Sequence, residues 1–254
     1  MSTRSQLLCI RSGYVFLALF VIGWVPLAHF VPPPDQAAGA QQIADMFRGN
    51  TFGIRLGMCL CIFASALLLP WGGAVIWQMR RVEGGHSPLV YAWIVAHACL
   101  TIEFIYPCMF WAVAAFRPEQ TDERIQAFND LAWLPFLGIT STAVFQAFAL
   151  AIVTLTDRRA VPLLPRWFGY FQIWDALLFA PAGLIMFFHD GPLAWNGVIA
   201  FWVAIIAAAA WFLVTTPVIA GAIKRAAGQP DDTAPDLADR VRRLEEQLAA
   251  LTRM

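Results

Sequence analysis

Long apolar runs alternate with short polar connections along the chain, and this pattern predicts its fold. A helix that crosses a bilayer needs roughly 20 apolar residues. Six runs of about this length or longer cover residues 13–30, 52–79, 89–116, 131–155, 170–188 and 196–223. Hydrocarbon offers no water to the backbone, so each run must satisfy its own peptide groups, which a helix does. We therefore predict an all-α membrane protein in which residues 1–227 form a six transmembrane helix bundle.

The first run occupies the position of a secretory signal peptide, but its surroundings favour a retained span. Residues 13–30 exceed a usual signal core, and Pro32, Pro33 and Pro34 follow where a small-residue cleavage site is expected. We interpret this run as an uncleaved first helix.

The basic residues between the runs predict which way the helices cross. Thirteen of the 17 Lys and Arg residues fall on one side of the predicted membrane: Arg4, Arg11, Arg80, Arg81, Arg158, Arg159, Arg166, Lys224, Arg225, Arg240, Arg242, Arg243 and Arg253. The other side holds Arg48, Arg55, Arg117 and Arg124. Cytoplasmic loops carry the excess of basic residues. We therefore expect both termini in the cytoplasm and place the chain in a bacterial inner membrane.

Tryptophan positions give the same map, because indole prefers the headgroup level of a bilayer. The expected inner boundary carries Trp77, Trp93, Trp167 and Trp174. The expected outer boundary carries Trp111, Trp133 and Trp195. Between the first two runs, Pro34–Asn50 has a helical apolar pattern and predicts a short amphipathic helix on the outer surface.

The last residues, 228–254, read as a cytoplasmic linker followed by an amphipathic helix. Apolar residues recur there at alternating steps of four and three: Leu237, Val241, Leu244, Leu248 and Leu251. This is the seam of a short coiled coil, so we expect the chain to form a homo-oligomer through residues 237–251. Docking of the same segment on inner loops or on lipid is the alternative.

A stripe of small residues on the second run offers a second contact for self-association. Gly53, Gly57, Cys61 and Ser65 are spaced by four residues and allow another helix to approach closely.

Ionisable and polar groups at bilayer depth are the candidate functional residues, because such groups are costly there. Glu103 lies near the middle of the third run and is the strongest candidate, either as a ligand-binding or proton-carrying carboxyl or as a hydrogen-bonded packing residue. His97 and Thr101 share one face of the same helix. With Glu103 and with Gln146 of the fourth run, they could line a polar cavity. The alternative for His97 is a hydrogen-bonded packing residue, which is the commoner role of a lone histidine within a span.

Two further charged residues are weaker candidates. Asp175 lies near the inner boundary of the fifth run, where a salt bridge with Arg158, Arg159 or Arg166 is the plainer interpretation. Arg55 begins the second run, where snorkelling to the headgroups is expected. A pair between Arg55 and Glu103 is disfavoured by their difference in depth.

No cofactor or metal is predicted. A haem or metal site at His29 and His189, with Asp190 nearby, is conceivable only because both histidines end runs on the same side. The five cysteines lack metal-site spacing. Net charge is zero, which gives no reason to expect a nucleic-acid partner.

Two segments carry a family resemblance. Pro165–Tyr170 and Phe188–Gly197, together with residues 116–119 and 129–131, resemble a family of uncharacterised bacterial integral membrane proteins of about this length. The resemblance covers the chain to about Ala227 and implies a six-helix fold. It implies no activity, so no site residue is carried over from it.

Three functions remain open from the sequence. The first is a small transporter-like or ligand-binding protein with an intramembrane polar cavity. The second is a non-catalytic accessory or scaffold subunit of a membrane complex, recruited through the tail. The third is a membrane redox protein that uses the outer histidines. Because catalytic motifs are lacking and the loops are short, we lean against an enzyme.

Overall fold

The computed structural model describes residues 2–84 and 86–227, and the predicted coiled-coil segment at 237–251 lies outside them. All regular secondary structure in the described chain is helical, and the described residues contain no strand. Six of its segments are long and apolar enough to cross a membrane, with lengths of 22 to 36 residues. They are Thr3–Leu27, Thr51–Glu83, Pro88–Phe116, Asp122–Thr156, Arg166–Phe187 and Gly191–Ala226. The chain is therefore a multi-pass membrane protein with six candidate spans, as predicted.

Several helices extend beyond the apolar runs from which they were predicted. Helix α1 (Thr3–Ile22) begins ten residues before the predicted run, where the side chain of Ser2 caps it by accepting from the N–H of Ser5 at 3.2 Å. Helix α6 (Asp122–Gly138) begins with two acidic residues in its first turn, which suit the positive end of the helix dipole. Hydropathy locates the part that meets lipid, whereas caps and charges decide where a helix starts.

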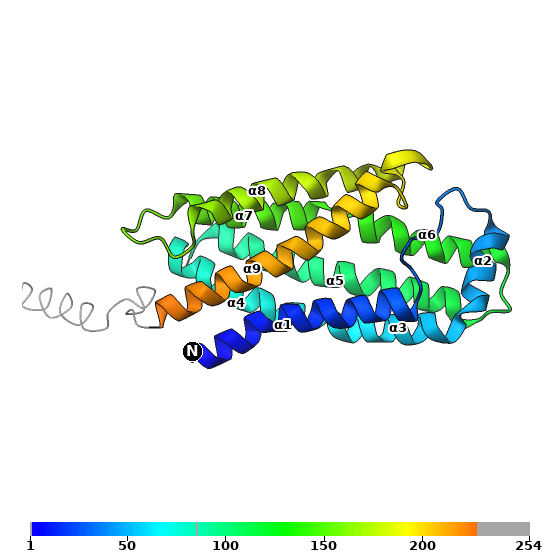
Figure 1. Ribbon diagram of the computed structural model, residues 1–254, viewed down its shortest axis with the longest axis horizontal. Helices are drawn as coiled ribbons and strands as arrows, with labels where there is room; N and C mark the ends of the chain where they lie inside the picture. Colours follow the sequence, from blue (N-terminus) through cyan, green and yellow to red (C-terminus); the bar gives the residue numbers. More distant parts are fainter. Residues whose placement is uncertain (1, 85, 228–254) are drawn as a thin grey trace, which may run out of the picture.

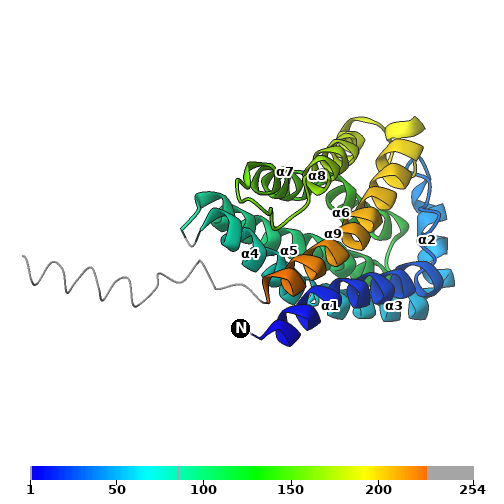
Figure 2. The same cartoon turned by 60° about the vertical axis from the view of Figure 1, so that its left-hand side comes forward.

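The helices run along the long axis of the molecule, with α5 (Pro88–Phe116) at the centre (Figure 1). Helix α5 contacts α3 (Thr51–Ser65), α4 (Leu68–Glu83), α6 and α7 (Ser141–Thr156). On the other side, α9 (Ala204–Ala226) packs on α1 and on α8 (Arg166–Phe179). Both ends of the described chain lie at the same end of the bundle, as an even number of crossings requires (Figures 1 and 2).

The predicted amphipathic helix is α2 (Ala40–Gly49), which crosses the opposite end of the bundle (Figure 1). It buries Ile43, Ala44 and Phe47 and packs on α6 of the same chain. Arg48 fixes its position by pairing with Asp122 at 2.8 Å. The apolar face of α2 is therefore covered by protein.

Two spans are interrupted near their middle. In the second, α3 ends at Ser65 and α4 begins at Leu68. Pro70 explains this break, because it cannot donate to the carbonyl of Ala66 and its ring crowds that carbonyl. In the fourth, Ile139 (φ −83°, ψ 69°) separates α6 from α7. The N–H of Thr140 bonds to the carbonyl of Gly138 at 3.0 Å, which closes an inverse γ-turn.

The remaining departures from α-helix occur at span ends. The first span finishes in the π-helical turn η1 (Gly23–Leu27), which contains Pro26. The fifth finishes in the 3-10 segment η2 (Ala180–Phe187), and the sixth includes the short 3-10 turn η3 (Gly191–Leu193) and the π-helical turn η4 (Val198–Val203).

The small-residue stripe of the second span is used within one chain. A Cβ on Gly57 would collide with the carbonyl oxygen of Gly23 in η1, and a Cβ on Gly23 would lie 2.6 Å from Sγ of Cys61. Cys61 and Ser65 are fully buried. The stripe therefore brings α3 against η1, and it does not present a free surface to a second copy as predicted.

Four of the tryptophans predicted at the membrane boundaries are covered by protein and do not face headgroups. Trp93, Trp111 and Trp133 are fully buried, and Trp195 is 3% exposed. Rings of Trp111 and Trp133 meet at 4.9 Å, and both belong to an aromatic cluster between α5, α6 and η1. Bulk and planarity make indole a good filler between helices, and in lipid the association of helices depends on such packing. Trp167 and Trp174 are more than half exposed, as expected for boundary residues.

Asp157 organises the connection between α7 and α8. Its carboxylate accepts from the backbone N–H groups of Arg159 (3.1 Å) and Leu163 (2.9 Å) and pairs with the guanidinium of Arg159 at 2.9 Å. Burial alone would raise the pKa of this carboxyl. The hydrogen bonds from Arg159 and Leu163, together with the charge of Arg159, outweigh burial and hold the pKa of Asp157 below its ordinary value of 3.8.

We expect the substitution Asp157→Asn to lower stability in a pH-dependent way. A depressed pKa in the folded state means that the ionised carboxylate stabilises the fold above pH 3.8, and that this contribution is lost as the pH falls through the folded-state pKa. At pH 7 the cost should be about 1–3 kcal/mol, typical of lost bonds to a charged group. Thermal unfolding in mild detergent from pH 7 to pH 3 measures it. A gap between variant and wild type that stays constant over this range would contradict the assignment.

Candidate functional site

His97 on α5 lies between the two interrupted spans. Its Nε2 is 2.9 Å from the carbonyl oxygen of Leu68, the first residue of α4. Its Nδ1 is 2.9 Å from Oε1 of Gln146 on α7. The ring also stacks on Trp93, with centroids 4.8 Å apart and planes 14° from parallel. With both nitrogens engaged and only 4% of its surface exposed, His97 has the contacts of a packing residue that ties α4, α5 and α7 together.

Gly72 makes room for this arrangement. A Cβ on Gly72 would fall onto the imidazole ring of His97. The absence of a side chain there lets α5 bring its histidine against the backbone of α4.

Gln146 and Thr142 extend the network along α7 to Glu103. The amide nitrogen of Gln146 donates to the carbonyl of Thr142 at 3.2 Å. The hydroxyl of Thr142 donates to Oε2 of Glu103 at 2.8 Å. Thr142 belongs to the first turn of α7, so Glu103 lies beside a helix N-terminus near the middle of the bundle. That end of a helix carries partial positive charge.

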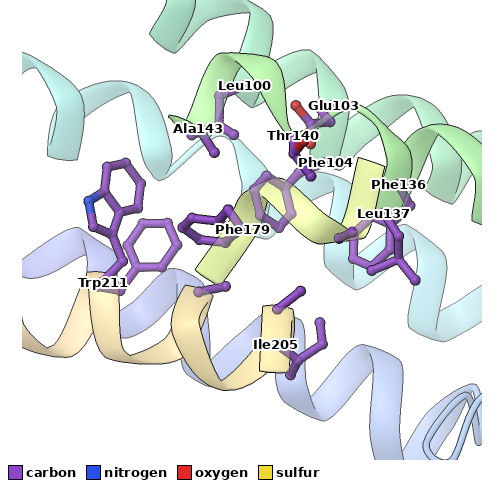
Figure 3. A pocket seen from close by; sticks show the side chains of 14 residues that line it. Leu100, Glu103, Phe104, Phe136, Leu137, Thr140, Ala143, Phe179, Ile205 and Trp211 are labelled. Carbon is purple, nitrogen blue, oxygen red and sulfur yellow. The ribbon is translucent and has the colours of Figure 1, made fainter. Parts of the chain in front are cut away.

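A cavity adjoins Glu103 and is lined by residues of α5, α6, α7, α8, η2 and α9. Its volume, measured for the centre of a water-sized sphere, is about 70 Å³, where roughly 10–15 Å³ suffices for one water. Aromatic and aliphatic side chains make up most of the lining, including Leu100, Phe104, Phe136, Phe179, Trp211 and Phe212. Glu103 and Thr140 are its two side chains with oxygen, and they lie together at one edge of it (Figure 3).

The structure therefore brings three predicted residues into one network but places only Glu103 at the cavity. The polar atoms of His97 and Gln146 are hydrogen-bonded to neighbouring helices and do not line the cavity. Thr101 is buried and donates to the carbonyl of His97, one turn back on its own helix, at 3.0 Å. The expected polar cavity is instead an apolar one with a carboxyl at its edge.

Trp211, which lines the cavity, is hydrogen-bonded to a buried polar residue, Gln172, that the sequence did not single out. The indole N–H of Trp211 donates to Oε1 of Gln172 at 2.8 Å, and the amide nitrogen of Gln172 donates to the hydroxyl of Thr215 at 3.2 Å. In the sequence Gln172 looks like a polar residue at the end of a span. Its role depends on Trp211 and Thr215 of α9, and a single sequence does not reveal these partners.

Asp175 lacks the salt bridge expected of it, whereas Arg55 does not pair with Glu103, in line with their difference in depth. Asp175 is fully buried, and neither of its carboxylate oxygens has a hydrogen-bond partner among the described residues. Among the described residues Asp175 forms no salt bridge with Arg158, Arg159 or Arg166, and Arg159 pairs with Asp157 instead. The guanidinium of Arg55 lies 5.3 Å from the ring centre of Phe116, a cation–π contact, and not beside Glu103.

The two outer histidines have separate surroundings. His29 lies 3.5 Å from the side-chain amide of Asn50, whereas His189 borders a recess with Asp130 and Gln36. Among residues 2–84 and 86–227, no group of three or more His, Cys, Asp or Glu side chains is placed to hold a metal ion.

No protein family model matches this chain, and neither a curated protein nor a solved structure resembles it at a significant level. The family resemblance drawn from Pro165–Tyr170 and Phe188–Gly197 therefore stays a prediction. Function has to be inferred from the geometry of the site.

We expect Gly72→Ala to destabilise the protein through His97. The added methyl group displaces the imidazole from Leu68 or Gln146, at a cost of about 1–3 kcal/mol for overpacking. Gly73→Ala is the matched control, because nothing lies within 4 Å of a Cβ there. Thermal unfolding in detergent should show a lower midpoint for the first variant alone.

Removing the imidazole should relieve the clash. In Gly72→Ala combined with His97→Ala, the two costs should therefore not add. Additive costs, or equal midpoints for the two glycine variants, would show that His97 does not depend on Gly72.

Proposed function

We propose that the protein binds a small, largely apolar molecule within the membrane and handles it in a transporter-like manner. The observation that carries this proposal is the cavity of about 70 Å³ with Glu103 at its edge. Apolar pockets with a few placed polar groups are the usual form of small-molecule sites. A carboxyl at bilayer depth is costly and is kept where it has a task.

Glu103 has a free oxygen to offer. Its Oε2 accepts from Thr142, and no described residue is hydrogen-bonded to Oε1. A ligand with a single N–H, O–H or basic nitrogen would bond there while its apolar part fills the space toward Phe179 and Trp211. The chemistry favours a lipophile with one polar end.

The interrupted spans support movement of such a ligand. The breaks after Ser65 and Gly138 interrupt the second and fourth spans, and the helices on both sides of each break contact α5. Discontinuous helices near the midplane form binding sites in many transporters, where half-helix ends provide polar backbone groups. Here the first turn of α7 contributes Thr142 to Glu103.

Filling the cavity should remove binding. Ala208 lines the cavity, so Ala208→Leu should weaken ligand binding about tenfold or more, equivalent to about 1.4 kcal/mol. Ala209→Leu, one residue along α9 and outside the lining, is the control. Glu103→Gln keeps the volume and should cost about 1–3 kcal/mol for a ligand that bonds to the carboxyl. Native mass spectrometry of detergent-extracted protein measures ligand occupancy. Equal occupancy in wild type and Ala208→Leu would refute the proposal.

We further propose a bacterial inner membrane as the location, with both termini in the cytoplasm, on the strength of the arginine asymmetry. Fusions of alkaline phosphatase after Ala226 or in the α4–α5 connection should be inactive, because that enzyme folds only outside the cytoplasm, where disulfides form. A fusion between α5 and α6 should be active. An active phosphatase fused after Ala226 would show that the orientation is the opposite of the one proposed.

Self-association through residues 237–251 remains a proposal that rests on the heptad spacing alone. The same mass spectra report copy number. A monomer, or a copy number that does not change when residues 237–251 are removed, would count against it.

A further inference from the structure

Glu103 borders a second recess besides the cavity. A groove of about 270 Å³ runs along the outside of the bundle, between the middle of α5 and the junction of α6 with α7. Its lining includes Cys99, Ile102, Tyr106, Ile139 and Thr142, together with Glu103 itself. The same carboxyl-bearing side chain thus borders both the cavity and the groove.

The groove is placed to contact lipid. Ile102, Tyr106 and Ile139 are 59%, 54% and 40% exposed, and Cys99 is exposed as well. They lie near the middle of the third and fourth spans, where the surroundings of an exposed side chain are acyl chains and not water. Apart from Glu103 and Thr142, the groove presents apolar groups and the hydroxyl of Tyr106.

The partition between groove and cavity includes the break in the fourth span. Thr140 lines the cavity, whereas Ile139 and Thr142 line the groove. Regular helix is interrupted here, since α6 ends at Gly138 and α7 begins at Ser141. A local shift of these few residues would join the two spaces without unpacking a complete helix, because hinges at element ends absorb backbone change.

We propose that the cavity is loaded sideways from the bilayer, through this groove, by a membrane-dissolved lipophile whose polar end is received by Glu103. This rests on the proposed function, because it assigns the ligand of the same cavity its source and route. Glu103 acts at the boundary: its carboxyl meets the polar end in the groove and remains in reach of it inside the cavity. A water-borne ligand would need an aqueous path, and the groove is instead open to hydrocarbon.

A lipid-soluble carbodiimide tests the route with a defined probe. Dicyclohexylcarbodiimide takes the proton of a carboxylic acid on one nitrogen while the carboxyl oxygen adds to its central carbon, and the adduct rearranges to an acylurea without a leaving group. With full-length protein in liposomes, we expect modification of Glu103, found by peptide mass spectrometry. Asp175 should stay unmodified, because it is fully buried and borders neither recess. A water-soluble carbodiimide should modify neither.

Two exposed cysteines provide matched variants for closing the groove. Cys99→Trp fills the groove beside Glu103, whereas Cys59→Trp fills a separate external recess near Arg55. We expect Cys99→Trp to slow modification of Glu103 about tenfold or more, equivalent to an added barrier of about 1.4 kcal/mol. Cys59→Trp should leave the rate unchanged, and both variants should unfold at wild-type temperature.

The outcomes separate this inference from the function on which it rests. If Glu103 is modified only by the water-soluble reagent, or equally fast in Cys99→Trp and wild type, lateral entry is wrong even where Ala208→Leu abolishes binding. If modification follows the prediction but Ala208→Leu leaves ligand occupancy unchanged, the groove is open to lipid and the cavity is not the binding site.

Discussion

The need to satisfy backbone hydrogen bonds without water governs this structure. A regular helix meets that need by itself, but the second and fourth spans are broken near their middle, where polar backbone groups need other partners. At the first break, the N–H of Leu69 bonds at 3.2 Å to the carbonyl of Ala66, which Pro70 leaves without its usual donor. The hydroxyl of Ser12 on α1 donates to the carbonyl of Leu67 at 2.7 Å, and the ring of His97 meets the carbonyl of Leu68. These two contacts link α1 and α5 to the start of α4.

The site follows from the same constraint. Where the fourth span breaks, α7 starts again with Thr142 in its first turn, and this hydroxyl bonds to Glu103. The break also leaves Thr140 at the wall of a cavity that an unbroken helix would reshape. Interruption, carboxyl and cavity therefore occur at one depth, and the proposed binding of a lipophile uses all three.

Close packing by very small and very large side chains completes the bundle. Glycines at positions 13, 23 and 72 give space to an indole, a neighbouring backbone and an imidazole, respectively. Aromatic rings then fill the wider gaps, as Trp24, Trp111 and Trp133 do between η1, α5 and α6. In lipid there is little hydrophobic gain from bringing helices together, so this fit supplies much of the attraction.

Sequence alone determined the class of the protein, the six spans and the helix α2, because hydropathy and periodicity report directly on contact with lipid and with a protein surface. It also singled out Glu103 as a candidate, since a carboxyl at mid-span stands out against apolar neighbours. Tertiary structure decided the partners. Hydropathy does not reveal how each helix is rotated or at what height it meets the next. The pairing of His97 with Gln146, the burial of Trp93 and the lack of a hydrogen-bond partner for Asp175 among the described residues could therefore not be predicted from spacing. Whether a polar residue lines a cavity or bonds to a neighbouring helix depends on that rotation, and only the packed bundle specifies it.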